Sequence, residues 1–248
     1  IPDSMRRIAL LILLWHFFVC ADLWAQSAEN LQSGVHDAKV NIGVKAGFNS
    51  SMFFIDEFKL GDYSLDHIQN NYKVGYFASF FVRFNLKKHH FLQTEASYHI
   101  AKGSISINQT TENIDFLKSN ALVKTTIHSV DVPLLYGYKF VDVYPYGMAF
   151  FVGPKVAYTW DKYTKCEYTS FYQQDIKESI RPFNFSAVIG LAVNVSNIFF
   201  DFRYEMGLHN MSEGVDFNRG ATEAPYNEQE IIIKRRRNVM SFSLGVIF

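Results

Sequence analysis

The sequence predicts an all-β protein, an eight-stranded antiparallel transmembrane β-barrel of the outer-membrane type. Three observations lead to this prediction. Apolar and polar side chains alternate with a period of two in eight separate stretches after residue 39, as in half-buried strands. The connections between these stretches are alternately short and long, which is typical of outer-membrane barrels. Aromatic residues are also abundant, at 17% of 248 residues.

The first stretch, VNIGVKAGF (40–48), shows the pattern. Val40 and Ile42 lie on one face of the expected strand, and Asn41 and Lys45 lie on the other. Nine residues are enough to cross a bilayer when a strand is tilted. The stretch is therefore predicted to be the first membrane-spanning strand.

The next three stretches are YKVGYFASFFVRFNL (72–86), HFLQTEASYHI (90–100) and VDVPLLYGYKF (130–140). Each has apolar residues at alternate positions and ionisable residues on its opposite face. These ionisable residues are Lys73, Arg83, Glu95, Asp131 and Lys139.

The last four stretches are YPYGMAFFVGPKVAYTW (144–160), FNFSAVIGLAVNV (183–195), FDFRYEMGL (200–208) and NVMSFSLGVIF (238–248). Their polar faces carry Lys155, Asp201, Arg203 and Glu205. The final stretch is expected to pair with the first and close the barrel, because an open edge would be unsatisfied in lipid.

The lengths of the connections distinguish the two ends of the barrel. Three of them are short: KKHH, VDV and SNI. Four are long and are expected to be loops, at roughly residues 49–71, 101–121, 161–182 and 209–237.

The apolar faces are predicted to face lipid and the polar faces the lumen. An eight-stranded barrel is only wide enough for side chains to fill it, and the apolar faces are too aromatic to fit inside. Glycines, in contrast, gather on the polar faces. The alternative is a soluble lipocalin-like barrel or sandwich, in which the apolar faces would form the core.

A lumen charge network follows from this orientation. Its expected members are Lys45, Arg83, Glu95, Asp131, Lys155, Asp201, Arg203 and Glu205. Buried charges must be paired, so these side chains are expected to fill the lumen as ion pairs. Arg203 is expected to pair with Asp201, Glu205 or Glu95. A small gated conduit is the alternative.

The N-terminal region is predicted to direct secretion. Arg6 and Arg7, followed by a short apolar run, indicate a signal peptide over residues 1–25 that includes a short upstream extension. Residues 26–39 would be a short periplasmic arm and residues 40–248 the barrel. A lipoprotein signal at Cys20 is the alternative. Once the signal is removed, Cys166 is alone, so no disulfide within the chain is expected.

The sequence gives little support for nucleic-acid binding, for a cofactor or metal, or for catalysis. The net charge is zero, so a nucleic-acid partner is not expected. No cofactor or metal is expected, because the acids of the first long connection lack calcium-loop spacing. His128 and Ser129 point to opposite faces, and His99 and Glu95 lie about 13 Å apart along a strand. The protein is therefore expected not to be an enzyme.

Two surface features suggest envelope partners. Lys234 and Arg236 in KRRRN share the lipid-facing side above the outer leaflet and could bind lipopolysaccharide phosphates. The alternative is a solvated charge run balanced by acids of the same loop. The C-terminal residues Phe242, Leu244, Val246 and Phe248 resemble the signal that is read by the barrel-assembly machinery.

Several segments together resemble a known family. They are VNIGVKAGFNSS, FLQTEASYHIAKGS, HSVDVPLLYGYKF, YPYGMAFFVGPKVAY and FFDFRYEMGLHNMS. In this order they are similar to the landmarks of the PorT-like outer-membrane barrels of Bacteroidetes, over about residues 40–248. These landmarks are strand patterns and not catalytic motifs.

The resemblance implies a location in the outer membrane with a periplasmic N-terminus. It also implies a non-enzymatic accessory of type IX secretion, which exports sorting-domain cargo to the cell surface in contact with other secretion components. The alternatives are a stand-alone surface barrel for adhesion or envelope integrity and, least favoured, a lipid A-modifying enzyme.

Overall fold

The structure is a computed structural model that describes residues 38–65, 68–87, 89–108, 117–160 and 164–248. The predicted signal peptide and most of the predicted arm lie outside these residues. Residues 39–248 fold as one unit.

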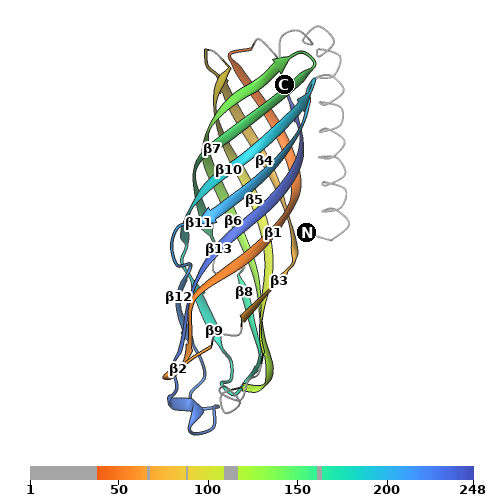
Figure 1. The fold of residues 1–248 in the computed structure, drawn as a ribbon. Coiled ribbons are helices and arrows are strands. Elements are labelled where there is room, and N and C mark those ends of the chain that lie inside the picture. The colour runs from red at the N-terminus through yellow and green to blue at the C-terminus, as the bar shows by residue number, and fades with distance from the viewer. Residues whose placement is uncertain (1–37, 66–67, 88, 109–116, 161–163) are drawn as a thin grey trace, which may run out of the picture. The chain divides into compact units, whose positions relative to one another are not determined.

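Eight antiparallel strands form a closed ring (Figure 1). In ring order they are β1 (Val40–Leu60), β4 (Val74–Asn85), β5 (His90–Ile107), β6 (Leu117–Val143), β7 (Tyr146–Thr159), β10 (Phe183–Val195), β11 (Ile198–Gly207) and β13 (Ile231–Ile247). The last strand pairs with the first, so that Phe48 lies opposite Phe242. Ile42 and Phe248 exchange two backbone hydrogen bonds at the end of this seam. The predicted barrel of eight antiparallel strands is confirmed.

The short connections all lie at one end of the ring, which we call the short-turn end; it is uppermost in Figure 1. At the opposite end, strands of the wall continue past the ring and meet smaller elements. We call this end the head. It comprises residues 51–60, 101–107, 117–129 and 231–237 of the wall strands together with the smaller elements β2 (Tyr63–Ser64), β3 (Ile68–Tyr72), β8 (Lys165–Phe171), β9 (Lys177–Ile180), β12 (Ser212–Asp216) and the 3-10 helix η2 (Tyr226–Glu228).

The small strands extend the sheet unevenly around the head. β3 pairs with β5 beyond the end of β4, and β8 pairs with β6. β9 and β12 form a separate two-stranded sheet. Among the described residues, no helix has the length and apolar character needed to cross a membrane.

Four wall strands are longer than the alternation predicted. β1 continues to Leu60, β5 to Ile107, β6 begins at Leu117 and β13 begins at Ile231. The prediction that these segments are loops was therefore wrong. The alternation of polar and apolar residues persists in the head, but there the apolar residues point inward and the polar residues point outward.

The exchange of faces gives the head its own hydrophobic core. Phe53, Ile105, Val123 and Ile127 occupy inward positions and are almost completely buried. Polar residues such as Lys124 face outward on the same strands. The core also contains Phe58, Leu60, Leu65, Ala101, Ile107, Leu117, Ala121, Phe171, Ile180, Met211, Ile231 and Ile233.

The ring itself has the opposite polarity. Phe48, Phe80 and Leu244 point outward and are about half exposed, whereas Lys45 and Glu95 point inward and are buried. Aromatic side chains border this apolar surface at both ends. Tyr158 packs against Trp160 near the head, and His90 stacks on Tyr136 near the short-turn end. This polarity is that of a membrane barrel and contradicts the soluble alternative.

Candidate functional site

The lumen is crossed by a network of buried ion pairs. Lys45 Nζ lies 3.0 Å from Glu95 and 2.9 Å from Asp201. Arg203 Nη2 lies 2.6 Å from Glu95 and 2.7 Å from Asp201. Two bases and two acids from β1, β5 and β11 therefore neutralise one another across the lumen, as burial of charge requires.

A second group of ion pairs lies beside the first. Lys155 Nζ donates to Asp131 at 2.6 Å and also to Glu205. Ser129 Oγ donates to Asp131 at 2.7 Å. His99 Nε2 lies 3.7 Å from Asp131 Oδ2, so it borders this group.

Arg83 is the predicted network member that lies apart from both groups. Its Nε donates to Gln93 Oε1 at 2.7 Å, and its guanidinium lies 4.6 Å from the centre of the Phe91 ring. The structure thus brings seven of the eight predicted residues into two groups. Arg203 meets two of its three expected partners, Asp201 and Glu95, while Glu205 binds Lys155 instead.

An aromatic layer that was not predicted from the sequence lies between the ion pairs and the short-turn end. It consists of buried phenylalanines that point inward, together with smaller apolar residues. The layer contains Phe81, Phe91, Phe151, Phe199, Leu135, Ala149, Val188 and Ala192.

Each of the four phenylalanines lies opposite a glycine of the neighbouring strand, in the pairs Phe81–Gly43, Phe91–Gly137, Phe151–Gly190 and Phe199–Gly245. The glycines leave the space that the rings fill: a Cβ at Gly137 would lie 2.1 Å from the Phe91 ring. A phenylalanine on the lumen side opposite a glycine is the signal that could have revealed the layer.

The charges and rings together close the lumen. The cavity beside Lys155 and Arg203 has a solvent-accessible volume of about 10 Å³, which is close to the minimum for one water molecule. Among the described residues, the barrel interior is therefore filled largely by paired charges and aromatic rings.

The head is held together by a buried arginine. Arg235 donates to Glu178 through Nε at 3.0 Å and through Nη2 at 2.7 Å, and neither side chain has exposed surface. Tyr168 Oη also donates to Glu178, at 2.7 Å. The Arg235 guanidinium lies 4.6 Å from the centre of the Phe53 ring. The cluster joins β13 to β8 and β9.

Cys166 belongs to the edge of this cluster. Its Sγ lies 3.7 Å from Arg235 Nη2 and 3.9 Å from Thr125 Oγ1. Burial and the Glu178 carboxylate raise the pKa of the Cys166 thiol to about 11. The same two causes raise the pKa of Tyr168 well above its usual value. Both groups are therefore neutral at physiological pH, which suits a structural role.

Lys234 and Arg236 point outward at the seam of the head, on the side that sequence analysis predicted. Each has a carboxylate partner on β1: Lys234 Nζ lies 2.6 Å from Glu57, and Arg236 forms two hydrogen bonds with Asp56 at 2.8 and 2.9 Å. Hydrogen bonds from Lys234 and Lys59 lower the pKa of Glu57 to about 2. These partners come from the first long connection rather than from the loop that contains the bases.

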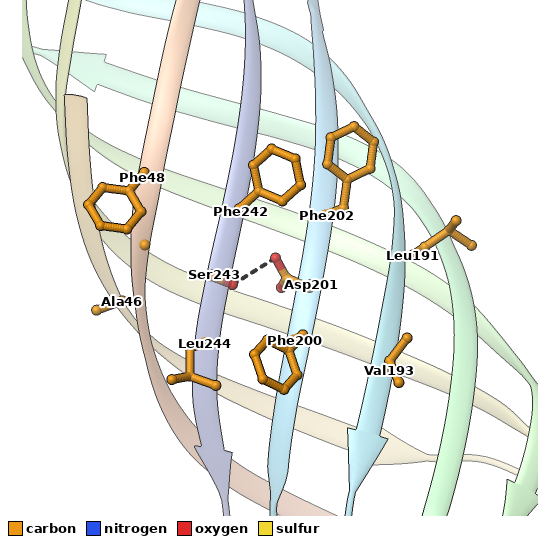
Figure 2. A pocket seen from close by; sticks show the side chains of 11 residues that line it. Ala46, Phe48, Leu191, Val193, Phe200, Asp201, Phe202, Phe242, Ser243 and Leu244 are labelled. Carbon is orange, nitrogen blue, oxygen red and sulfur yellow. Dashed lines mark hydrogen bonds between the residues drawn. The ribbon is translucent and has the colours of Figure 1, made fainter. Parts of the chain in front are cut away.

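The C-terminal strand presents its predicted assembly residues to the outside. Phe242, Leu244 and Phe248 are about half exposed, and Val246 is less so. Figure 2 shows the surroundings of Phe242 and Leu244, a shallow apolar groove on the outer surface of the seam. Ser243 points the other way and donates to Asp201 at 2.8 Å (Figure 2).

The histidine pairs considered for catalysis do not come together. His128 faces outward and bonds to Tyr98 Oη at 2.9 Å, whereas Ser129 is buried in the lumen with Asp131. His99 stacks on Phe77 at 4.7 Å between ring centres. Within the described ranges, no group of three or more His, Cys, Asp or Glu side chains could hold a metal ion.

Solved structures of other barrels are similar to this chain. OprG from Pseudomonas aeruginosa has a TM-score of 0.49 and 8% identity, over 84% of this chain and 95% of OprG. Ail of Yersinia pestis has a TM-score of 0.34 and 11% identity, over 85% and 99%. Neisserial surface protein A has a TM-score of 0.36 and 9% identity, over 84% and 97%. A search of curated proteins finds no match.

The sequence also matches a family of membrane proteins directly. The model of the outer membrane protein beta-barrel domain matches residues 24–213, which is most of the chain. This match agrees with the outward apolar surface and the inward charges of the ring. The protein is therefore an outer-membrane barrel and belongs to the outer membrane protein beta-barrel domain family.

Proposed function

We propose that the protein is a non-enzymatic accessory of type IX secretion that acts through the surfaces of its barrel and not through its lumen. The filled lumen carries this proposal. Ion pairs such as Lys155–Asp131 and rings such as Phe91 occupy the interior of the ring. A solute could pass only if several buried, paired charges lost their partners, which is costly.

In this proposal the head faces the outside of the cell and the N-terminal arm lies in the periplasm. Short turns are periplasmic and long connections extracellular in barrels of this type. Lys39 and Phe248 both lie at the short-turn end, where Lys39 O accepts a hydrogen bond from Asn85 N. The packed core of the head would then give the cell surface a folded module for contacts with other proteins.

The assignment to type IX secretion is supported by the resemblance of the strand landmarks, such as VDVPLLYGYKF, to PorT-like barrels. The landmarks are shared by PorT and its sibling barrels. Other components of the secretion system are the proposed partners.

A stand-alone surface barrel for adhesion or envelope integrity is the second candidate. The packed head favours this candidate, because the buried Arg235–Glu178 pair and the core around Phe53 make the head a rigid surface for contacts. Such a surface could act without secretion machinery. A lipid A-modifying enzyme remains the third and least favoured proposal.

A deletion strain separates these candidates. The type IX proposal predicts that sorting-domain cargo fails to reach the surface and that the intact gene restores export. Normal export in the deletion strain would refute it. Loss of attachment with normal export would favour the adhesion candidate. A changed lipid A mass spectrum with normal export would favour the enzyme.

Lipopolysaccharide contact by Lys234 and Arg236 remains a proposal. Together with Lys59 these bases outnumber their acidic partners, Asp56 and Glu57, by three to two. The remaining charge is small, so we expect contact with anionic lipid to be weak. Flotation with lipopolysaccharide vesicles should be lower for Lys234→Gln/Arg236→Gln than for the unmodified protein, and equal flotation would refute the contact.

A further inference from the structure

Two lysines flank a threonine on the outer face of the head. Lys102 on β5 lies directly opposite Thr126 on β6, and Thr126 lies directly opposite Lys165 on β8. The lysines are exposed and the threonine is half-buried. We call these three residues the lysine row. Because neighbouring strands are about 4.8 Å apart, the two lysines begin about 10 Å from each other, and their flexible side chains can meet over Thr126.

Acidic residues are scarce in this part of the head. In the described residues, the portions of β5, β6 and β8 that lie in the head contain one acid, Glu167, and four bases, Lys102, Lys118, Lys124 and Lys165. Glu167 lies directly opposite Lys124. Lys118 Nζ lies 5.7 Å from the centre of the Tyr172 ring. Among the same residues, neither Lys102 nor Lys165 forms an ion pair, in contrast to the bases of the seam.

Lys73 adds a further positive charge beside the lysine row. It is exposed and follows Tyr72 of β3, whose partner on β5 is Gly103, so it lies next to Lys102. Like charges that face each other across adjacent strands are destabilising. A bound anion would relieve this repulsion.

The lysine row lies just beyond the aromatic residues that border the apolar surface of the ring. His128 lies two residues from Thr126 on the same face of β6 and bonds to Tyr98 Oη at 2.9 Å. The rings of Tyr98 and Trp160 are in contact, with 6.3 Å between their centres. Tyrosine and tryptophan lie at the level of the lipid headgroups in membrane proteins. Two residues of a strand span about 7 Å, so the lysine row lies in the outer part of the headgroup layer.

We propose that the lysine row binds a phosphate group of a glycolipid in the outer leaflet. Two ammonium groups and a hydroxyl can all donate hydrogen bonds to the oxygens of one phosphate. The apolar surface of the ring directly below favours a lipid phosphate over free phosphate, because it can contact the acyl chains of the same molecule. The seam bases Lys234 and Arg236 differ, since each already has a carboxylate partner. The site does not depend on a role in secretion.

Matched lipids test this site. The purified barrel is placed in phosphatidylcholine nanodiscs that contain equal amounts of bisphosphorylated lipid A and of the same lipid without phosphates, and the retained lipid is identified by native mass spectrometry. The unmodified barrel should retain the phosphorylated form preferentially. Lys102→Gln/Lys165→Gln should lower this preference roughly 30-fold, because each lysine beside an anionic surface contributes roughly fivefold. Lys118→Gln/Lys124→Gln removes the same number of charges from β6 and should lower it much less.

The outcomes separate this site from other kinds of binding. An equal loss in the two variants would indicate a general attraction of the basic surface for anionic lipid and would overturn the site, as would the absence of a preference in the unmodified barrel. Inorganic phosphate should leave the glycolipid bound, and its displacement would assign the lysine row to free phosphate instead. The heat-dependent shift on a gel shows that each variant is folded before its lipid is measured.

Discussion

Arg235 on β13 and Glu178 on β9 form a bidentate ion pair in which neither side chain has exposed surface. The two residues are separated by 57 positions in the chain. Their pair attaches the small β9–β12 sheet to the extended wall, and the Arg235 guanidinium lies beside the Phe53 ring of the head core. The head is therefore closed by a polar contact within an apolar core.

Glu178→Leu should loosen the head, because it leaves the buried Arg235 charge without an acidic partner. Loss of one member of a buried pair costs about 3–5 kcal/mol, whereas replacement of both by apolar residues is often neutral. Hydrogen exchange of β9 and β12 amides should therefore speed up strongly in Glu178→Leu and much less in Arg235→Met/Glu178→Leu. Equal exchange in the two variants would show that the pair is not what closes the head.

The ion pairs at the outer seam predict a response to acid. The pKa of Glu57 lies at about 2, below its ordinary 4.5, because Lys234 and Lys59 stabilise the carboxylate. A lowered pKa stabilises the folded state above pH 4.5, and this contribution is lost as the pH falls towards 2. Lys234→Met should move the carboxyl titration of Glu57, measured by NMR, back towards 4.5. Arg236→Met is the control, since its partner is Asp56, and an equal change there would contradict the assignment.

Two neighbouring positions of the last strand test which side faces lipid. Leu244 points outward, and Ser243 points inward and donates to Asp201. Leu244→Lys should destabilise the barrel by about 2–4 kcal/mol if the residue lies near the bilayer midplane. Ser243→Asn is a polar substitution that keeps a donor beside Asp201 and should cost much less. Urea titrations of folding into lipid vesicles, followed by the heat-dependent shift on a gel, compare the two, and the opposite order would exclude this orientation.

A substitution at the end of the same strand should also affect assembly of the barrel in cells. Phe248 faces outward directly after β13, and we propose that it belongs to a barrel-assembly signal. Phe248→Ser should lower the amount of barrel in the outer membrane without abolishing folding into lipid vesicles. Ile247→Val, at the buried neighbouring position, is the control. Unchanged amounts of Phe248→Ser in the membrane would show that Phe248 is not part of an assembly signal.

The ring could be predicted from sequence because one physical rule governs it. Side chains such as Phe242 face lipid and side chains such as Ser243 face the lumen, so a period of two with polar and apolar faces is enough to find the strand. Strand β10 was predicted with its observed limits, Phe183–Val195. The partners of Lys155 across the lumen depend on register and could not be derived from the period.

The head escaped prediction because its polarity is reversed. In β6, Val123 and Ile127 point inward into the head core, whereas Asp131 points inward into the charged lumen. The alternation is continuous along this strand, but the environment on each side changes near Ser129. A prediction that places only polar residues in the interior therefore misses the part of β6 that lies in the head. The phenylalanines of the lumen were missed for the same reason.

In our proposal the lumen is sealed, so that the protein acts through its surfaces. The closure rests on paired charges such as Arg203–Glu95 and on rings such as Phe91 and Phe151. Phe91→Ala/Phe151→Ala removes two rings from the aromatic layer. It is the variant to compare with the unmodified protein, because ion leakage through the lumen is expected there first.

Electrical recording in planar lipid bilayers tests this claim most directly. The purified barrel should insert and give no stepwise increase in conductance at moderate voltage. Stable single-channel steps from the unmodified protein would contradict the sealed lumen and would favour a conduit.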